Sequence, residues 1–138
     1  MARRINQYTK DIVVCPHDTT GSTWYAAVAE SWGQGSLPGG LYRTTNRGKT
    51  WVQMELPLPK GGAESVGVSP VNPRSVFVST EQEGLWSCCG NEPCRMVTAY
   101  PFFHPLRILF PPNATKDNNM FVTSFGGGLM TGMGWDIC

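Results

Sequence analysis

The sequence predicts an all-β fold made of three repeats, and three observations support this prediction. A glycine-led segment returns at a constant spacing, since Leu41, Leu85 and Leu129 lie 85 − 41 = 44 and 129 − 85 = 44 residues apart. Runs rich in β-branched and aromatic residues precede each of these leucines. The 138 residues include 16 glycines and 11 prolines, which favours many turns between short elements.

Each repeat begins with two apolar strands. The first strand ends at a proline and is found as DIVVCP at 11–16, SVGVSP at 65–70 and RILFPP at 107–112. Turn-forming residues follow, and then come the second strands TWYAAVA, SVFVST and NMFVTS. Short apolar runs bounded by turn residues are typical of strands that are buried in a sheet.

The third and fourth strands complete a unit of four. The third strand is the glycine-led segment GGLYRT, EGLWSC or GGLMTG, and the fourth is expected at 50–56, 94–100 and 135–138. A period of roughly 40–50 residues with four short strands is typical of a β-propeller blade. The sequence therefore predicts one domain, 1–138, with blades at about 11–57, 64–101 and 106–138, and with 1–10 as a closing strand.

The segment TTNRGKTW at 44–51 resembles the Asp-box, a Ser/Thr-x-Asp-x-Gly-x-Thr-Trp turn. Asp-box (BNR-type) repeats occur in sialidases, xyloglucanase-like glycosidases, sortilin-like proteins and photosystem assembly factors, so the resemblance also implies a β-propeller. Asn46 stands where the box usually has aspartate. We expect Asn46 to bond backbone amides of the turn, Gly48 to adopt a positive φ, and Trp51 to be buried between neighbouring blades.

Three blades leave an open arc, because closed propellers use roughly four to eight. Two copies would supply 2 × 3 = 6 blades, with the first blade of each copy packed against the third blade of the other. The sequence therefore predicts a homodimer that closes a six-bladed ring. The alternative is that the chain is a piece of a longer propeller and behaves as an aggregating or partly folded fragment.

Ligands of such a fold are expected at the loops between second and third strands and at the connections between blades. The first of these loops, 29–39, is about eight residues longer than its counterparts and contains Trp32. The Trp32 ring either stacks on a ligand or folds back over its own blade. The candidate ligand-binding residues are Glu30, Trp32, Glu81, Glu83, Tyr100 and His104.

The favoured function is a non-catalytic binding module for a carbohydrate or a protein. One alternative is a xyloglucanase-like glycoside hydrolase, which needs a pair of carboxylates. A second alternative is a scaffold for protein assembly. No residue is assigned a catalytic role, and the carboxylates available for the hydrolase alternative are Asp11, Glu30, Glu64, Glu81 and Glu83.

The chain has five cysteines, and three of them fall in the segment CCGNEPC. This spacing differs from that of ordinary zinc sites, so no metal and no cofactor is expected. A Cys88–Cys94 or Cys89–Cys94 bridge would clasp this hairpin in an oxidising compartment, and in a reducing one the cysteines would be free thiols.

The net charge of +1, with no basic block beyond Arg3 and Arg4, argues against nucleic acid as a partner. No apolar run approaches the roughly 18 residues that cross a membrane, so no membrane partner is expected. The N-terminal segment lacks the apolar core of a signal peptide. The default expectation is therefore a cytoplasmic protein, or a secreted one if a leader has been removed.

Overall fold

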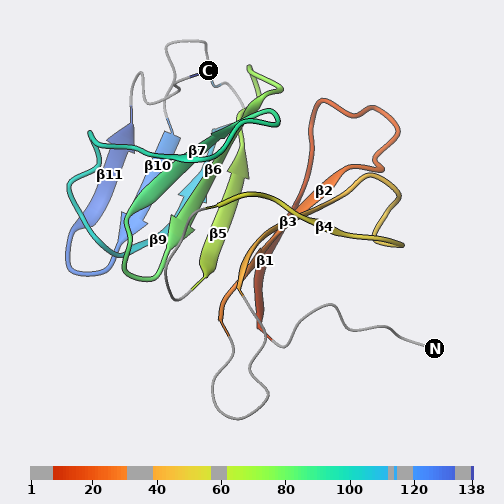
Figure 1. Cartoon of the computed structure of the whole chain (residues 1–138). Helices are drawn as coiled ribbons and strands as arrows, with labels where there is room; N and C mark the ends of the chain where they lie inside the picture. The colour runs from red at the N-terminus through yellow and green to blue at the C-terminus, as the bar shows by residue number, and fades with distance from the viewer. Residues whose placement is uncertain (1–7, 31–38, 57–61, 112–113, 115–119, 133–137) are drawn as a thin grey trace.

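The computed structural model describes residues 8–30, 39–56, 62–111, 114, 120–132 and 138. Every regular element in these ranges is a β-strand, and the strands form three antiparallel sheets that follow one another along the chain (Figure 1). None of the three sheets closes on itself. The prediction of an all-β fold is confirmed.

Within each sheet the strands lie side by side in sequence order. The first sheet contains β1 (Thr9–Val14), β2 (Trp24–Val28), β3 (Gly40–Thr44) and β4 (Val52–Gln53). The second contains β5 (Ala63–Val68), β6 (Ser75–Thr80), β7 (Leu85–Cys89) and β8 (Arg95–Met96). The third contains β9 (Pro105–Leu109), β10 (Met120–Ser124) and β11 (Gly128–Gly132). Of the fourth strand expected there at 135–138, all but Cys138 lies outside the described residues.

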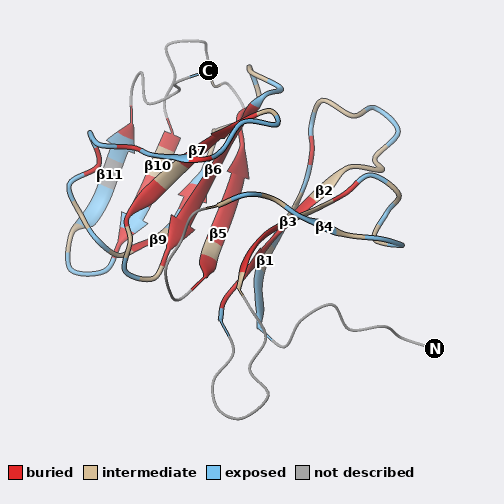
Figure 2. Cartoon of the chain, viewed as in Figure 1, coloured by how far each residue is buried: buried red, intermediate tan, exposed pale blue. Residues whose placement is uncertain are grey.

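The second sheet is buried on both faces (Figure 2). Val66 and Val68 point toward the first sheet, where they share one core cluster with Tyr25, Ala27 and Leu41. Side chains alternate between the two faces of a strand, so neighbouring residues of β5 serve opposite junctions. Removal of such aliphatic side chains from water stabilises the fold by about 1.5–3 kcal/mol each.

The opposite face of the second sheet packs on the third sheet. Phe77 and Leu85 form a second core cluster with Ile108 and Val122. The rings of Phe77 and Phe110 lie with their centroids 6.0 Å apart. The two clusters together fix the order first sheet, second sheet, third sheet.

The turn at 44–51 is closed by its own side chains. The Asn46 Oδ1 atom accepts hydrogen bonds from the Thr44 hydroxyl (2.8 Å) and the Thr50 amide (2.9 Å), while its Nδ2 atom donates to the Thr50 hydroxyl (2.7 Å). Thr44 Oγ1 in turn accepts from the Gly48 amide, and Gly48 has φ +84°. The expected roles of Asn46 and Gly48 are confirmed.

The prediction that Trp51 is buried between neighbouring repeats is wrong. Trp51 is half-buried and lies against Gly48 of its own turn, together with Trp24. Met54 and Leu56, just beyond β4, pack instead against the core cluster between the first two sheets. The aromatic ring therefore covers the turn rather than the junction.

The β1–β2 turn lies beside the turn at 44–51. The Arg47 guanidinium donates to the carbonyl of Thr20 over 2.8 Å, which joins the two turns. The Asp18 carboxylate accepts hydrogen bonds from the hydroxyls of Thr20 and Thr23 and from the amides of Thr20 and Ser22. These hydrogen bonds, that of the Thr20 hydroxyl above all, lower the pKa of Asp18 to about 2.

Two disulfides hold the end of β7. Cys88 is bonded to Cys94, six residues away, and Cys89 is bonded to Cys138, 49 residues away. The predicted Cys88–Cys94 bridge is thus confirmed, and the alternative pairing of Cys89 with Cys94 is wrong. The Cys89–Cys138 bond was not expected from the sequence. Cys15 is a buried free thiol.

The Asn46 network predicts different outcomes for two substitutions. Asn46→Ala removes three hydrogen bonds of the turn and should lower the free energy of unfolding by about 1–2 kcal/mol. Asn46→Asp keeps both acceptor bonds, and the Thr50 hydroxyl can rotate to donate, so its effect should stay within about 0.5 kcal/mol. Urea unfolding measures both, and equal destabilisation by the two variants would contradict the network.

The burial of the sulfur atoms predicts an order of reduction. Cys138 is exposed, whereas Cys88 and Cys94 are buried in the core cluster between the first two sheets. A mild phosphine reductant should therefore open Cys89–Cys138 first, because access controls attack on a disulfide. Alkylation followed by peptide mass spectrometry should label Cys89 and Cys138 before the other pair. Simultaneous labelling of all four residues would count against this order.

Candidate functional site

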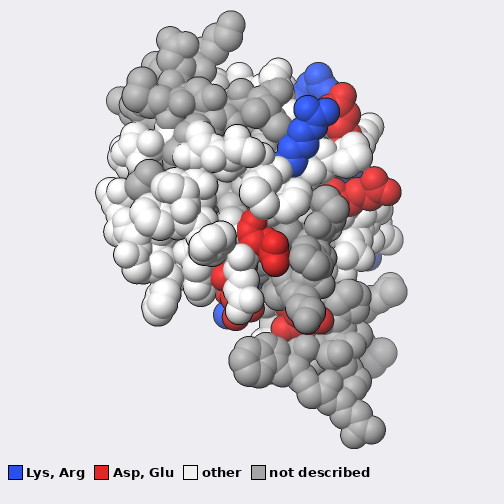
Figure 3. Space-filling model, turned by 60° about the vertical axis from the view of Figure 1, so that its left-hand side comes forward, with Lys and Arg blue, Asp and Glu red and all other residues white. Residues whose placement is uncertain are grey.

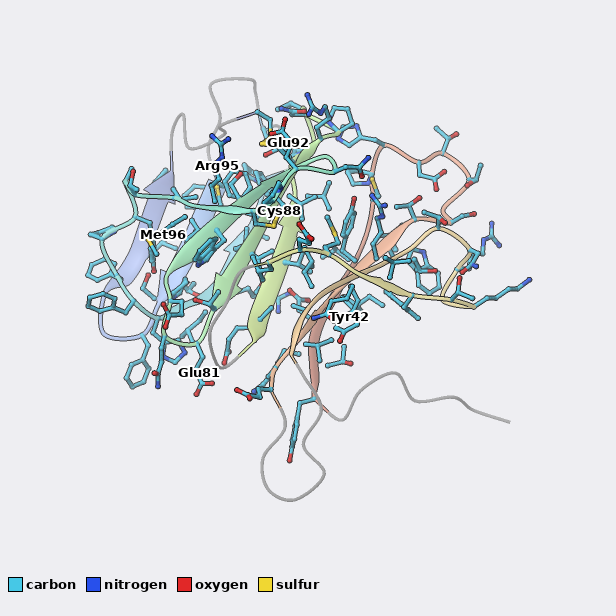
Figure 4. All side chains as sticks on the ribbon, in the orientation of Figure 1. Tyr42, Glu81, Cys88, Glu92, Arg95 and Met96 are labelled. Carbon is cyan, nitrogen blue, oxygen red and sulfur yellow. A yellow bond between two sulfur atoms is a disulfide. The ribbon has the colours of Figure 1, made fainter. Side chains whose placement is uncertain are left out.

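The loops expected to carry the ligand site lie at one end of the molecule. The β6–β7 and β10–β11 turns are both at the lower end in Figure 1, where β1 and β5 begin. Figure 4 places Glu81 at this end, and Glu92 and Arg95 at the other. Trp32 lies in the segment 31–38, outside the described residues.

A cleft of about 270 Å³ opens at this end, where residues of the first two sheets meet. Three of its lining residues are carboxylates named from the sequence, and they come from three separate parts of the chain. We call it the acidic cleft; its lining residues are Tyr8, Lys10, Ala29, Glu30, Glu64 and Glu81.

Glu30 is held at the cleft by the backbone around it. The Ala29 amide donates to the carbonyl of Tyr8 over 2.8 Å, and Ala29 forms an isolated β-bridge with Gly62. A Cβ atom on Gly39 would lie 2.6 Å from the Glu30 amide nitrogen, and one on Gly62 would lie 2.5 Å from the carbonyl oxygen of Val28. Only glycine permits this close approach of three backbone segments.

The other two carboxylates come from the second sheet. Glu64 is the second residue of β5, and Glu81 directly follows β6. The β6–β7 turn is fixed by Thr80, whose hydroxyl donates to the Gly84 carbonyl (2.6 Å) and accepts from the Glu83 amide (2.9 Å). These two hydrogen bonds of the buried Thr80 hydroxyl fix the start of the turn and therefore the position of Glu81.

The acidic cleft combines groups with complementary binding chemistry. Ionised carboxylates accept hydrogen bonds, a lysine ammonium donates them, and a tyrosine ring offers an apolar face with a polar tip. Such a set can bind several hydroxyl groups and one face of a sugar ring. Among the described residues, no group of three or more His, Cys, Asp or Glu side chains is arranged to hold a metal ion.

Glu83 and Tyr100 line a different cleft, of about 200 Å³, beside the turn that carries Glu81. The remaining lining is largely apolar, and Phe103 in it is 81% exposed. Tyr100 is buried, with its hydroxyl hydrogen-bonded to the Ser124 side chain. Burial raises the pKa of Tyr100, and the bond to Ser124 opposes this.

His104 and Asp11 contribute to neither cleft. The His104 ring packs on Phe125 with centroids 5.4 Å apart, beside the β10–β11 turn. The Asp11 carboxylate accepts hydrogen bonds across the junction of the first two sheets, from the Ser65 hydroxyl (2.8 Å) and the Val66 amide (3.2 Å). Asp11 is therefore engaged in sheet packing.

Sequence reasoning missed Tyr8 and Lys10. Both precede the first apolar run and were included in the expected closing strand at 1–10. The structure starts β1 at Thr9, so Lys10 belongs to a strand of the first sheet. Extension of the strand alternation backwards from Asp11 would have brought these two residues into the search.

Searches of protein-family models and of curated proteins yield no match to the chain. The described part of the chain contains no helix that is long and apolar enough to span a membrane. The candidate site therefore rests on its geometry and chemistry.

The glycine contacts around Glu30 predict a large difference between two similar substitutions. Gly21 and Gly62 both have φ +69°, but a Cβ on Gly21 would meet no atom within 4 Å. Gly21→Ala should therefore cost only the left-handed backbone strain, about 1–2 kcal/mol. Gly62→Ala should cost roughly a further 1–3 kcal/mol, because its methyl group meets backbone atoms. Thermal unfolding measures the difference, and equal costs would contradict the tight packing behind Glu30.

Proposed function

We propose that the three sheets are β-propeller blades of the Asp-box type and that the chain is a non-catalytic carbohydrate-binding module. The observation that carries this proposal is the convergence of Glu30, Glu64 and Glu81 with Lys10 and Tyr8 in one cleft. The ring of blades, on this proposal, is completed by a second copy of the chain.

The arrangement of the strands supports the blade interpretation. In each sheet the strands follow in sequence order, and the first strands β1, β5 and β9 contact one another in succession. The first strands of propeller blades line the central axis in this way. The 44-residue spacing of Leu41, Leu85 and Leu129 supports the same interpretation.

The chemistry of the acidic cleft favours a carbohydrate over other small ligands. A sugar presents several hydroxyl groups, which can each donate to a carboxylate and accept from an ammonium group. Tyr8 is 45% exposed, and a tyrosine ring can stack against an apolar sugar face. A cleft open to solvent also suits an extended oligosaccharide.

The two disulfides support an oxidising compartment rather than the cytoplasm. Disulfides persist in secreted and periplasmic proteins and are rare where thiols are kept reduced. Polysaccharides are abundant substrates and ligands outside cells, so the proposed compartment and the proposed ligand agree.

A glycan array followed by calorimetry with xyloglucan and β-glucan oligosaccharides tests the binding function. We expect Glu30→Gln and Glu81→Gln each to weaken binding roughly tenfold, about 1.4 kcal/mol, because each removes a charged acceptor from the cleft. Glu92→Gln is the matched control, since Glu92 is an exposed carboxylate at the opposite end (Figure 4). Binding that is insensitive to both cleft variants, or no binding on the array, would refute the proposal.

The same three carboxylates favour one second candidate, a glycoside hydrolase. Glycoside hydrolysis requires an acid and a second carboxylate that flank the scissile bond. Release of new reducing ends from xyloglucan or β-glucan, abolished by the same glutamine substitutions, would identify a hydrolase. Binding without release would identify a binding module.

A further inference from the structure

We infer that two copies of this chain associate by packing the outer face of the first sheet of one copy against the outer face of the third sheet of the other. The inference rests on the blade assignment proposed above, but it does not depend on the ligand.

Equivalent positions of the repeats differ in burial according to whether a neighbouring sheet is present. Ile12, Val66 and Ile108 occupy the same place in the first strands of the three repeats. Val66 is 1% exposed and Ile108 is 6% exposed, because each faces the preceding sheet, whereas Ile12 is 52% exposed. The outer face of the first sheet thus has the same apolar pattern, and no sheet formed by the described residues covers it, although Ala26 on this face is only 1% exposed.

We call this surface the entry face. Ile12 pairs across the strands with Ala26, which pairs with Tyr42, and Val14 pairs with Trp24, so these side chains share one face. The residues of the entry face are Ile12, Val14, Trp24, Ala26 and Tyr42.

The third sheet shows the converse pattern. Leu41 and Leu85 are both 0% exposed because each faces the following sheet, whereas their counterpart Leu129 is 63% exposed. Leu109 is also exposed and pairs with Phe121 on this side of the sheet. Figure 3 shows mostly uncharged atoms on this side of the molecule. We call it the exit face, consisting of Arg107, Leu109, Phe121, Thr123 and Leu129.

Both junctions inside the chain pack an exit-type face on an entry-type face. Tyr25 and Leu41 of the first sheet meet Val66 and Val68 of the second, and Phe77 and Leu85 meet the third sheet's Ile108 and Val122 in the same relation. The outer faces of the first and third sheets, which no other sheet of the described residues covers, are therefore one of each type. In a dimer, the entry face of each copy can pack against the exit face of the other copy.

Charge complementarity supports the same pairing. At the first junction Asp11 bonds the Ser65 hydroxyl and the Val66 amide, and at the second junction Ser65 accepts from the Ile108 amide. Each bond runs from the third residue of one repeat's first strand to the first strand of the next repeat. Arg107 occupies this position in the third repeat and is exposed. The same relation brings Arg107 to the first strand of the second copy, where the Asp11 carboxylate, although it is bonded to Ser65 and Val66 of its own chain, supplies the opposite charge.

Analytical ultracentrifugation of the whole chain tests the inference. We expect a dimer of 2 × 15.1 = 30.2 kDa for the wild type. Leu129→Glu and Ile12→Lys should each raise the dissociation constant at least ~100-fold, because each buries an unpaired charge. Arg107→Glu should raise it roughly tenfold or more by facing Asp11, whereas Arg107→Lys should retain the dimer.

Two controls distinguish this interface from nonspecific hydrophobic association and from misfolding. Val71→Glu alters an exposed apolar residue outside both faces and should leave the dimer intact. An equimolar mixture of the Leu129→Glu and Ile12→Lys chains should recover a dimer, since one junction then holds a Glu–Lys pair and the other is wild type. Two results would overturn the inference. The first is a wild-type protein that sediments as a 15.1 kDa monomer at protein concentrations up to about 100 μM, and the second is a dimer that survives both charge substitutions. Oligosaccharide binding in the acidic cleft should persist in the monomeric variants. Failure of the dimer interface can therefore be distinguished from failure of the proposed carbohydrate binding.

Discussion

The alternation of side chains along β5 is the constraint on which the rest of the structure depends. Val66 and Val68 turn to the first sheet, while Gly67 between them faces the third. A Cβ on Gly67 would lie 2.6 Å from the Cγ2 atom of Ile108, so the missing side chain allows β9 to approach β5 closely. One strand thereby holds both neighbouring sheets at fixed positions and sets their order.

The same packing creates the acidic cleft. Glu64 lies on β5 itself, and the bridge between Ala29 and Gly62 joins the end of the first sheet to the start of that strand. Glu30 and Glu64 therefore reach the cleft because the junction of the two sheets brings their backbones together. A ligand bound there would contact two sheets at once, so binding should also stabilise their junction.

The sequence predicted the repeat and its strands well because apolar periodicity, prolines and the Gly-Leu segment recur at a fixed spacing. It also predicted the hydrogen bonding of Asn46, which depends only on residues a few positions away. It failed for Trp51 and for the Cys89–Cys138 bond, because both depend on which distant segments meet in space. The acidic cleft was predicted in part: Glu30, Glu64 and Glu81 were recognised by their loops, whereas Lys10 required the true start of β1.

The outer faces of the first and third sheets carry the same side-chain pattern as the faces that pack together at the two junctions within the chain. A photo-crosslinking amino acid in place of Ile12 tests the proposed pairing of these faces most directly, since the position is exposed and central in the entry face. We expect crosslinks to residues 107–131 of another chain, identified by mass spectrometry on mixed isotope-labelled and unlabelled protein. Crosslinks confined to the same chain, or joining position 12 to the first sheet of the other chain, would contradict it.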